Sequence, residues 1–491
     1  MLNGFWTDDR NLSLLMDFYE LTMANGYFLQ SMHQKKALFE FFFRDIPDGG
    51  GFAIAAGLQQ VVDAVCNLRF TVSDLEYLRS KKMFSEDFLQ WLAETPFRCS
   101  IRAVPEGTPI FPGEPVLVVE GPLAQAQMVE SMLLNFMNHQ SLIATKANRI
   151  VRAAQGRAVM EFGTRRAHGP DAAIYGARAA YIGGCIGTAC TLSDSAMGVP
   201  AMGTMAHSWI QSFPDELSAF IAYAEAYPDN CTLLIDTYHV VESGLPNAVR
   251  AFQTVVVPKG YRPKGVRIDS GDLAYLSKIV RGALDGAGFP DCAIVASNAL
   301  DEDIISDLIL QGAPIDFFGV GERLITAKSD PVFGGVYKLA AIEESGKMSP
   351  RMKVSENPEK MTLPGGKRLF RLFDSKTHKA MADLITTDDP DDEVKAPYEL
   401  FDPDYTWKRK VVKGFVAKEL LQEVVSEGIL VTELPTLDEI RAYCLAQIDL
   451  LWDEVKRFEN PHKYWVDLSP RLWNLRNKLI QEHSGGRTRR K

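Results

Sequence analysis

The sequence predicts an α/β protein with a (β/α) barrel at its centre. Its 491 residues are enough for two to four domains. Six short apolar runs in the middle of the chain each end in a polar or glycine-rich turn. Successive turns lie roughly 20–45 residues apart, which is the length of a βα unit. Because barrels place their chemistry at the C-terminal ends of their strands, these turns are the expected site.

The six predicted strands follow one another between two less regular segments. They are Val159–Phe162, Pro200–Gly203, Leu233–Ile235, Gly265–Ile268, Ala293–Ala296 and Ile315–Phe318. The turns after them are Gly163–Arg166, Thr204–Ser208, Asp236–Tyr238, Asp269–Asp272, Ser297–Asn298 and Gly319–Gly321. Helical stretches separate the strands, and six such units in a row favour a barrel over a doubly wound sheet.

The segments on either side of the barrel have mixed patterns. Before it we expect helices at Leu12–Leu29, Phe52–Leu68 and Leu123–Ala154, and strands at Ala37–Phe43 and Val116–Glu120. After Tyr337 the chain becomes charged and turn-rich, and helical spacing returns from Leu437 to Ile480. The expected domains are residues 1–140, the barrel at 141–345, and a mostly helical unit at 346–491 that packs on the first.

Composition argues against several classes of protein. Lys and Arg number 53 against 63 Asp and Glu, and the net charge of −10 disfavours nucleic-acid binding. The basic tail Gly486–Lys491 is expected to be a solvated terminus. Neither a signal peptide nor a run of ~18 apolar residues is visible, so we expect a cytoplasmic protein without a membrane span. The seven cysteines are scattered without a CxxC pair, which disfavours disulfides and zinc.

Two of the turns carry basic side chains. Arg165 and Arg166 directly follow a strand, where two guanidinium groups suit a phosphate or a carboxylate. A surface ion pair is the alternative interpretation. His207 lies at the end of another strand beside hydroxyl groups, and it is either a base or nucleophile, or a structural histidine.

Of two further turns, one carries two carboxylates and the other is rich in glycine. Asp269 and Asp272 repel one another unless a cation or hydroxyl groups satisfy them, which fits Mg²⁺ or a ribose diol. Alternatively, Asp272 caps the helix that follows. Gly319-Val320-Gly321 either exposes backbone N–H groups to a phosphate or forms a plain turn. Together the turns suit an anionic substrate with several phosphates.

In this order, the turns resemble those of the nicotinate phosphoribosyltransferase family. The matching segments are Asp17–Met23, Glu161–Arg166, Gly203–Ser208, Arg267–Leu273, Gly319–Gly321 and Gly334–Leu339. The resemblance covers nearly the whole chain. It implies a type II phosphoribosyltransferase fold, with an irregular α/β barrel and an N-terminal α/β sandwich, in a homodimer with shared active sites. The implied reaction joins nicotinate to 5-phosphoribosyl 1-diphosphate, coupled to hydrolysis of ATP with Mg²⁺ as the activating ion.

The resemblance also implies roles for individual residues. His207 matches the histidine that the family phosphorylates, while Thr204 and Arg267 match nicotinate-binding positions. Phe162 and Tyr19 match the aromatic pair that stacks on the pyridine, with Tyr19 supplied by the partner subunit. The implied contacts to 5-phosphoribosyl 1-diphosphate and its phosphates are Arg165, Asp269, Ser297, Gly319, Gly321 and Glu322. No residue is assigned to a metal.

Two positions depart from the family pattern. Glu322 stands where the family often has Thr, and it is expected to bind ribose hydroxyls, pair with Arg323, or turn away. Ala189 stands where nicotinamide-using relatives carry Asp, which favours the acid over the amide. The alternatives are a nicotinamide phosphoribosyltransferase, a quinolinate phosphoribosyltransferase, and a non-catalytic barrel that senses a nucleotide.

Overall fold

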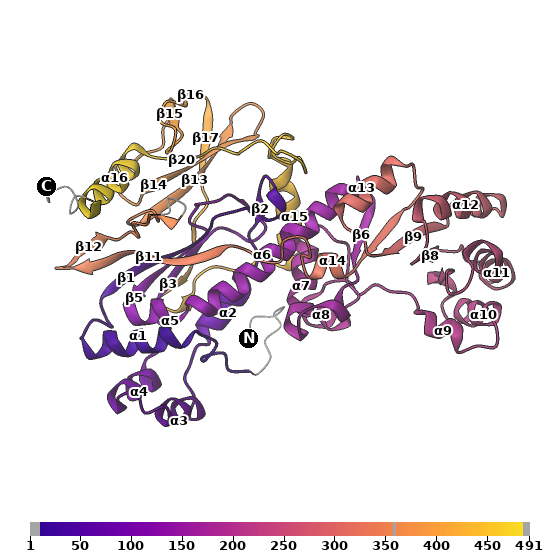
Figure 1. Cartoon of the computed structure of the whole chain (residues 1–491), viewed down its shortest axis with the longest axis horizontal. Helices are drawn as coiled ribbons and strands as arrows, with labels where there is room; N and C mark the ends of the chain where they lie inside the picture. The colour runs from indigo at the N-terminus through magenta and orange to yellow at the C-terminus, as the bar shows by residue number, and fades with distance from the viewer. Residues whose placement is uncertain (1–9, 357–359, 485–491) are drawn as a thin grey trace. The chain divides into compact units, whose positions relative to one another are not determined.

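The computed structural model describes residues 10–356 and 360–484, which form two compact units (Figure 1). Met1–Leu142 and Val332–Lys491 make up the first unit, and Ile143–Pro331 make up the second. The predicted C-terminal segment, residues 346–491, belongs to the first unit because strand β18 (Gln422–Ser426) pairs with β3 (Ser100–Ala103). The predicted basic tail lies outside the described residues.

Two sheets build the first unit. The larger has seven strands in the order β12-β11-β1-β5-β3-β18-β19, and the smaller has four in the order β17-β13-β14-β20. The strands of the larger sheet not yet given are β1 (Lys36–Phe43), β5 (Leu117–Pro122), β11 (Gly335–Glu344), β12 (Lys347–Pro350) and β19 (Ile429–Leu430). Those of the smaller sheet are β13 (Lys367–Asp374), β14 (Ala380–Thr387), β17 (Phe415–Glu419) and β20 (Val466–Leu468).

Short ribbons and helices complete this unit. β2 (Ala53–Ile54) pairs with β4 (Pro109–Ile110), and β15 (Tyr398–Phe401) pairs with β16 (Arg409–Val412). Its helices are α1 (Phe18–Leu29), α2 (Leu58–Cys66), α3 (Val72–Ser80), α4 (Glu86–Glu94), α5 (Leu123–Met128), α15 (Leu437–Asp449) and α16 (Pro470–Ser484). Helix α6 (Glu130–Ala153) begins in the first unit and ends in the second.

The C-terminal part contains more strand than the helical pattern predicts. The expected helical stretch from Leu437 to Ile480 breaks into α15, β20 and α16. Pro461 and Pro470 explain the break, because proline removes a backbone donor and is tolerated at the start of a helix, where Pro470 begins α16. β13 and β14 lie in the charged stretch where no strand is predicted.

The second unit is built on a parallel sheet in the order β6-β10-β9-β8-β7. Its strands are β6 (Ala158–Glu161), β7 (Thr232–Leu234), β8 (Gly265–Ile268), β9 (Ala293–Asn298) and β10 (Phe317–Val320). Two isolated parallel bridges, Glu161 to Thr188 and Thr188 to Ala201, extend it beyond β6. Five of the six predicted strands are therefore present. The sixth, Pro200–Gly203, is reduced to the bridge at Ala201, and the bridge at Thr188 is not predicted because no apolar run surrounds it.

Helices connect these strands as the βα pattern predicts. They are α7 (Pro170–Ile182), α8 (Thr191–Met197), α9 (His207–Gln211), α10 (Glu216–Ala226), α11 (Leu245–Ala251), α12 (Leu273–Gly286), α13 (Glu302–Leu310) and α14 (Glu322–Ile325). Two π-helical turns, Val240–Gly244 and Phe252–Val256, flank α11. The alternation of parallel strands and helices agrees with an irregular (β/α) barrel.

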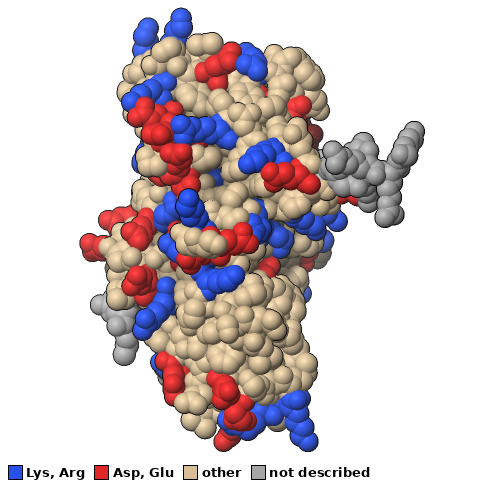
Figure 2. Space-filling view, turned by 90° about the vertical axis from the view of Figure 1, so that its left-hand side faces the viewer, with Lys and Arg blue, Asp and Glu red and all other residues tan. Residues whose placement is uncertain are grey.

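Charges of both signs are interleaved on the face shown in Figure 2. Blue Lys and Arg side chains lie beside red Asp and Glu side chains, rather than in one large patch of a single sign. Exposed ion pairs among the described residues include Arg471 with Asp389 and Arg409 with Glu399. Within residues 10–356 and 360–484, no helix has the length and apolar character needed to span a membrane.

A buried polar network ties β13 and β14 to the loop before β5. The Arg371 guanidinium donates to the Asp383 carboxylate at 2.6 Å, and the Tyr464 hydroxyl donates to the same carboxylate at 3.0 Å. Arg371 also donates to the Pro109 carbonyl at 2.8 Å. Burial, together with the charge of Asp383 and a hydrogen bond to it, raises the pKa of Glu114 well above its usual value. This upward shift favours the protonated form of Glu114, which can donate a hydrogen bond to Asp383.

This network predicts a pH-dependent effect of Glu114→Gln on stability. Because the folded pKa is raised, the unfolded chain releases this proton first as the pH increases. The wild-type protein therefore loses up to about 1.4 kcal/mol of unfolding free energy per pH unit above the unfolded pKa of Glu. Glutamine keeps a donor for Asp383 and has no proton to release. Urea denaturation from pH 5 to pH 8 should therefore show a smaller decrease in the free energy of unfolding for Glu114→Gln than for the wild type.

The exposed Glu393→Gln change is the matched control, and it should follow the wild-type curve. If the curve of Glu114→Gln also parallels the wild-type curve at every pH, Glu114 is not the buried acid described here.

Candidate active site

A pocket of about 420 Å³ opens at the C-terminal ends of the second unit's strands. Every strand of the parallel sheet, or the turn after it, contributes to its wall, as do the segment at 202–207 and Ala189. The predicted site residues that line it are Phe162, Arg165, Thr204, His207, Arg267, Asp269, Ser297, Gly319, Gly321 and Glu322. The structure thus brings together every predicted site residue except Tyr19.

Phe162 presents an aromatic surface to this pocket, and glycine makes room for it. The Phe162 N–H donates to the Val320 carbonyl at 2.7 Å, which fixes the turn after β6 against β10. A Cβ atom at Gly319 would approach the Phe162 ring to 2.6 Å, and one at Gly321 would lie 3.2 Å from the Phe162 carbonyl. Larger residues at position 319 would therefore displace the ring.

Arg267 lies beside this ring, held by two polar neighbours. Its guanidinium carbon lies 5.7 Å from the centre of the Phe162 ring. Nε donates to the Ser297 hydroxyl at 2.8 Å, and Nη2 donates to the Asp269 carboxylate at 3.0 Å. A third N–H approaches the Met205 carbonyl at 3.5 Å. Of the five N–H groups of arginine, two remain for a ligand among the described residues.

Ser297 hydrogen-bonds to Arg267 and is too buried to offer its hydroxyl freely to a ligand. The side chain is only 2% exposed, and its hydroxyl accepts from Arg267 and donates to Asp269. The other carboxylate oxygen of Asp269 lies 3.8 Å from His207 Nε2, beyond hydrogen-bond distance. The two residues predicted to contact phosphates thus orient Arg267 directly in this structure.

His207 begins helix α9 and reaches into the pocket. Its Nδ1 lies 3.1 Å from the Thr237 hydroxyl, which belongs to the turn after β7. The side chain is 41% exposed, so the second ring nitrogen is accessible. A hydroxyl partner at Nδ1 fixes the plane of the ring. The contact also bridges two segments of the barrel that share no strand pairing among the described residues.

Cations and glycine backbone gather on the β6 and β10 side of the pocket. Arg165 and Arg166 are exposed and follow β6 directly in the 3₁₀ turn Thr164–Arg166. Among the described residues no ion pair with either side chain is found, which disfavours the interpretation as surface ion pairs. Gly321 precedes α14, and Gly319 and Gly321 place backbone without side chains at the same pocket.

Glu322 is engaged with a lysine rather than with Arg323. Its carboxylate lies 3.0 Å from Lys328 Nζ, and this hydrogen bond lowers the pKa of Glu322. Arg323 instead pairs with Asp301. The expectation that Glu322 pairs with Arg323 is therefore wrong.

The second carboxylate of the predicted Asp269 and Asp272 pair has a structural role. Asp272 is the N-cap of α12, and its side chain accepts from the Tyr275 N–H at 3.0 Å. The helix-cap interpretation of Asp272 is confirmed. Asp236, after β7, is the carboxylate nearest to Asp269 in this network, because it accepts from the Asp269 N–H at 3.1 Å and from the Ser270 hydroxyl at 2.6 Å.

Two smaller residues, Thr204 and Ala189, also line the pocket. The Thr204 hydroxyl is buried and has no hydrogen-bond partner among the described residues. Ala189 lines the pocket with an exposed methyl group. A buried hydroxyl without a partner costs free energy, which a bound ligand would recover.

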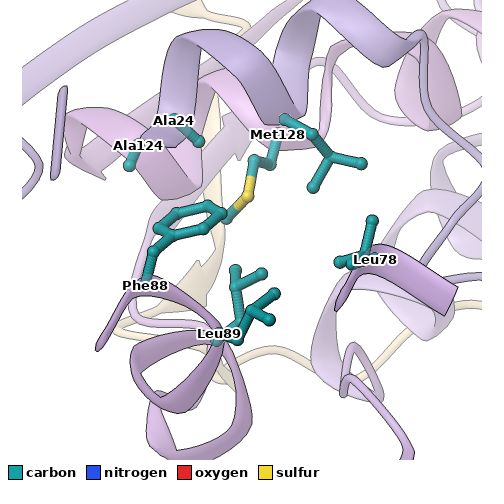
Figure 3. Packing of buried hydrophobic residues seen from close by; sticks show 8 residues of the cluster. Ala24, Leu78, Phe88, Leu89, Ala124 and Met128 are labelled. Carbon is teal, nitrogen blue, oxygen red and sulfur yellow. The ribbon is translucent and has the colours of Figure 1, made fainter. Parts of the chain in front are cut away.

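Tyr19 lies in the first unit and is absent from the lining of this pocket. Its helix α1 packs through Leu21 and Ala24 into a core of side chains from α1, α3, α4 and α5, several of which converge in Figure 3. This packing leaves Tyr19 on the opposite face, 44% exposed. Partial burial and the charges of Glu130 and Glu20 raise the pKa of Tyr19, so its phenol stays neutral.

Several residues of the site are not predicted from the sequence. Thr188 and Thr237 lie outside the sequence segments that resemble the family motifs. Glu161 begins the matching segment Glu161–Arg166, but the sequence assigns it no role. Asn298 lines the pocket with a φ of 114°, a conformation that costs of order 1–3 kcal/mol for a residue with a side chain. Its place in the turn after β9 was the available signal. Across the described ranges, no group of three or more His, Cys, Asp or Glu side chains could hold a metal ion.

Comparisons with known proteins agree with this architecture. Residues 14–138, 157–362 and 366–476 match the models described as the N-terminal domain, the family and the C-terminal domain of nicotinate phosphoribosyltransferase. The Bacillus subtilis protein named nicotinate phosphoribosyltransferase is 43% identical over 486 residues, which are 98% of each chain.

Two solved structures are also similar. The human nicotinic acid phosphoribosyltransferase structure has a TM-score of 0.83 at 32% identity, covering 94% of this chain and 99% of the human chain. A nicotinate-nucleotide pyrophosphorylase from Pyrococcus furiosus has a TM-score of 0.67 at 24% identity, covering 91% of this chain and 98% of the other, and it shows the fold alone. With its type II phosphoribosyltransferase architecture and its family matches from residue 14 to 476, the chain belongs to the nicotinate phosphoribosyltransferase family.

Proposed function

We propose that this pocket joins nicotinate to 5-phosphoribosyl 1-diphosphate, giving nicotinate mononucleotide and diphosphate. The observation that carries the proposal is the arrangement around Phe162. An aromatic face, a guanidinium with two remaining N–H groups, and two further arginines line one pocket. These groups match a pyridine ring, its carboxylate and the phosphates of the second substrate.

The pyridine ring would stack on Phe162 with its carboxylate toward Arg267. The two remaining N–H groups of Arg267 suit a carboxylate, and the partnerless Thr204 hydroxyl supplies another donor on the same pocket wall. As the bond between the ring nitrogen and the ribose forms, the ring becomes a pyridinium. Stacking on the π face of Phe162 favours that positive charge.

The phosphates would bind between Arg165, Arg166 and the backbone around Gly319 and Gly321. Mg²⁺ commonly binds through one or two carboxylates together with substrate phosphates, and it would neutralise the departing diphosphate. Asp236 and Asp269 fit this mode, because one oxygen of Asp236 is buried without a hydrogen-bond partner in the described part of the chain. Glu322, held by Lys328, would face the ribose hydroxyls.

His207 would accept the γ-phosphoryl group of ATP, which couples ATP hydrolysis to the transfer. With Nδ1–H donating to Thr237, the lone pair lies on Nε2, the accessible nitrogen. Attack by Nε2 on the γ-phosphorus breaks its bond to the β-phosphate oxygen and releases ADP. Water later cleaves the P–N bond and releases phosphate. The phosphorylated ring would help to organise Mg²⁺ and the diphosphate.

The active form would be a homodimer in which Tyr19 of one subunit completes the site of the other. Tyr19 is exposed, neutral and held on a well-packed helix, as a stacking residue at an interface requires. A direct test of the whole proposal is an assay of nicotinate with 5-phosphoribosyl 1-diphosphate, with and without ATP. The proposal is supported if diphosphate is released only when both substrates are present. It is contradicted if no diphosphate is released either with ATP or without it.

His207→Ala should abolish the stimulation by ATP and leave a slow ATP-independent transfer. The substitution removes the phosphoryl acceptor at an exposed helix start, so the fold should be kept. Diphosphate release should be measured with and without ATP, alongside phosphoenzyme formation from γ-labelled ATP. Thr237→Val, which keeps the acceptor but removes its partner, should lower the yield of phosphoenzyme less severely. An acid-labile phosphoenzyme in His207→Ala would show that another residue is phosphorylated.

Phe162→Ala and Tyr19→Ala should each raise the KM for nicotinate more than the KM for 5-phosphoribosyl 1-diphosphate. The loss of stacking and buried area is worth on the order of 1–3 kcal/mol. Initial rates at varied nicotinate concentration measure the effect. Phe162→Leu, which keeps apolar area without the π face, separates stacking from packing.

Mixed dimers test the source of Tyr19. Subunits carrying Tyr19→Ala and subunits carrying His207→Ala each lack one component, and mixing them should restore part of the ATP-dependent activity. The fraction of mixed dimers must be measured by native mass spectrometry. If verified mixed dimers show no recovery, Tyr19 does not act in the partner's site.

Ala189→Asp should shift the preference from the acid toward the amide. A carboxylate at this position repels nicotinate and accepts from the NH₂ group of nicotinamide. The ratio of kcat/KM for acid over amide should fall by at least about tenfold, which needs only ~1.4 kcal/mol of differential binding. Because Ala189 is exposed, the new charge is not buried by folding.

Ala189→Asn is the matched control, since it has the same shape without the charge. It should change the acid-to-amide ratio less than Asp does. A folded Ala189→Asp enzyme with an unchanged ratio would show that position 189 does not distinguish the substituents.

A further inference from the structure

We propose that Glu161 and Thr188 are positioning residues that fix the two walls of the nicotinate pocket relative to one another. The proposal rests on the function proposed above and deepens it, because it names residues behind the pocket that control substrate fit. Both side chains are fully buried, with 0% exposure, and neither lines the pocket.

The contact between the two residues is direct. Glu161 ends strand β6, and its Oε2 accepts a hydrogen bond from the Thr188 hydroxyl at 2.6 Å. Its Oε1 accepts from the Gly163 N–H in the turn that follows. One carboxylate thus holds its own turn and a segment 27 residues further along the chain.

Thr188 is the centre of a narrow three-stranded arrangement. Its backbone bridges Glu161 on one side and Ala201 on the other, through single parallel bridges rather than a continuous ladder. Its hydroxyl also accepts from the Cys190 N–H at 3.0 Å. Backbone hydrogen bonds also cross these segments, from the Ala189 N–H to the Glu161 carbonyl at 2.8 Å and from the Met202 N–H to the Thr188 carbonyl at 2.8 Å. The side-chain hydrogen bonds of Thr188 add to this backbone constraint.

The residues next to this contact are those that face the substrate. Phe162 and Arg165 follow Glu161, and Ala189 follows Thr188. The hydrogen bond therefore sets the separation between the aromatic face and the position that discriminates the ring substituent. A change of a few tenths of an ångström across it alters the width of the pocket where the pyridine and its carboxylate must fit.

The chemistry of the contact explains why a carboxylate is buried behind this pocket. Two donors, the Gly163 N–H and the Thr188 hydroxyl, converge on it, and each carboxylate oxygen accepts one of them. A glutamine has an acceptor oxygen at only one of these two positions, because its NH₂ group is a donor. Burial raises the pKa of Glu161, while the hydrogen bonds from Thr188 and Gly163 act in the opposite direction. The acid is thus retained at a cost in desolvation, which the two hydrogen bonds offset.

The test compares Thr188→Val with Thr188→Ser. Valine has the shape of threonine without the hydroxyl, whereas serine keeps the hydroxyl. Thr188→Val should raise the KM for nicotinate by about tenfold, the loss expected for one hydrogen bond to a charged group. Its kcat should change less, its acid-to-amide ratio should shift, and Thr188→Ser should restore both values.

Glu161→Gln provides a second variant, in case Thr188→Val folds poorly. It should reproduce the rise in the KM for nicotinate, and the double variant should cost less than the sum of the two changes, since both break the same contact. Thermal melts accompany each measurement. Full additivity in the double variant would show that the two residues act independently and would overturn the proposal.

The outcomes separate this proposal from the proposed function. If the wild type converts nicotinate but folded Thr188→Val and Glu161→Gln keep its KM and acid-to-amide ratio within twofold, the positioning role is wrong. A lower melting temperature with unchanged KM would likewise show a purely structural contact. If the wild type itself does not convert nicotinate, the proposed function fails first, and the positioning role falls with it.

Discussion

The parallel register of the second unit's sheet determines where all of the chemistry lies. Val320 is aligned with Glu161 on one side and with Asn298 on the other, so three strands end at one level. The turns that follow must therefore begin side by side, although they lie far apart in the chain. Each turn can then contribute one or two side chains to a shared pocket. Backbone pairing alone therefore places the Phe162 ring, the guanidinium groups and the His207 imidazole around one pocket, independently of contacts between these side chains.

Polar side chains connect parts of the barrel that backbone pairing does not join. The segment at 201–207 and strand β7 share no strand pairing in the described structure, yet His207 contacts Thr237, and Arg267 reaches the Met205 carbonyl. The same groups that face a substrate thus also join the margins of the barrel. Arg267 illustrates the compromise, because Ser297 and Asp269 occupy part of its hydrogen-bonding capacity and orient what remains.

The turns were predictable from sequence because their residue types are unusual at the ends of apolar runs. His207, Arg165 and Asp269 stand out in this way, and the run of motifs identified the family. The contacts among them were not predictable. Ser297 was expected to meet a phosphate, but its hydroxyl is directed at Arg267 and Asp269. Thr188 lacks the apolar neighbours that mark a strand, so its bridge was missed. In the C-terminal part, β13 and β14 pair with each other across a short connection, and they were missed because the sequence around them is rich in charged and turn-forming residues.

The exposed methyl group of Ala189 has an evolutionary consequence. The hydrogen bonds that hold this wall come from its backbone N–H and from its buried neighbours Glu161 and Thr188, rather than from its side chain. If position 189 distinguishes the acid from the amide, as proposed, selection on substrate preference acts at this position while selection on folding acts at its neighbour. Some alanine codons become aspartate codons by a single-nucleotide change, so the proposed shift toward the amide would then be one reversible mutational step.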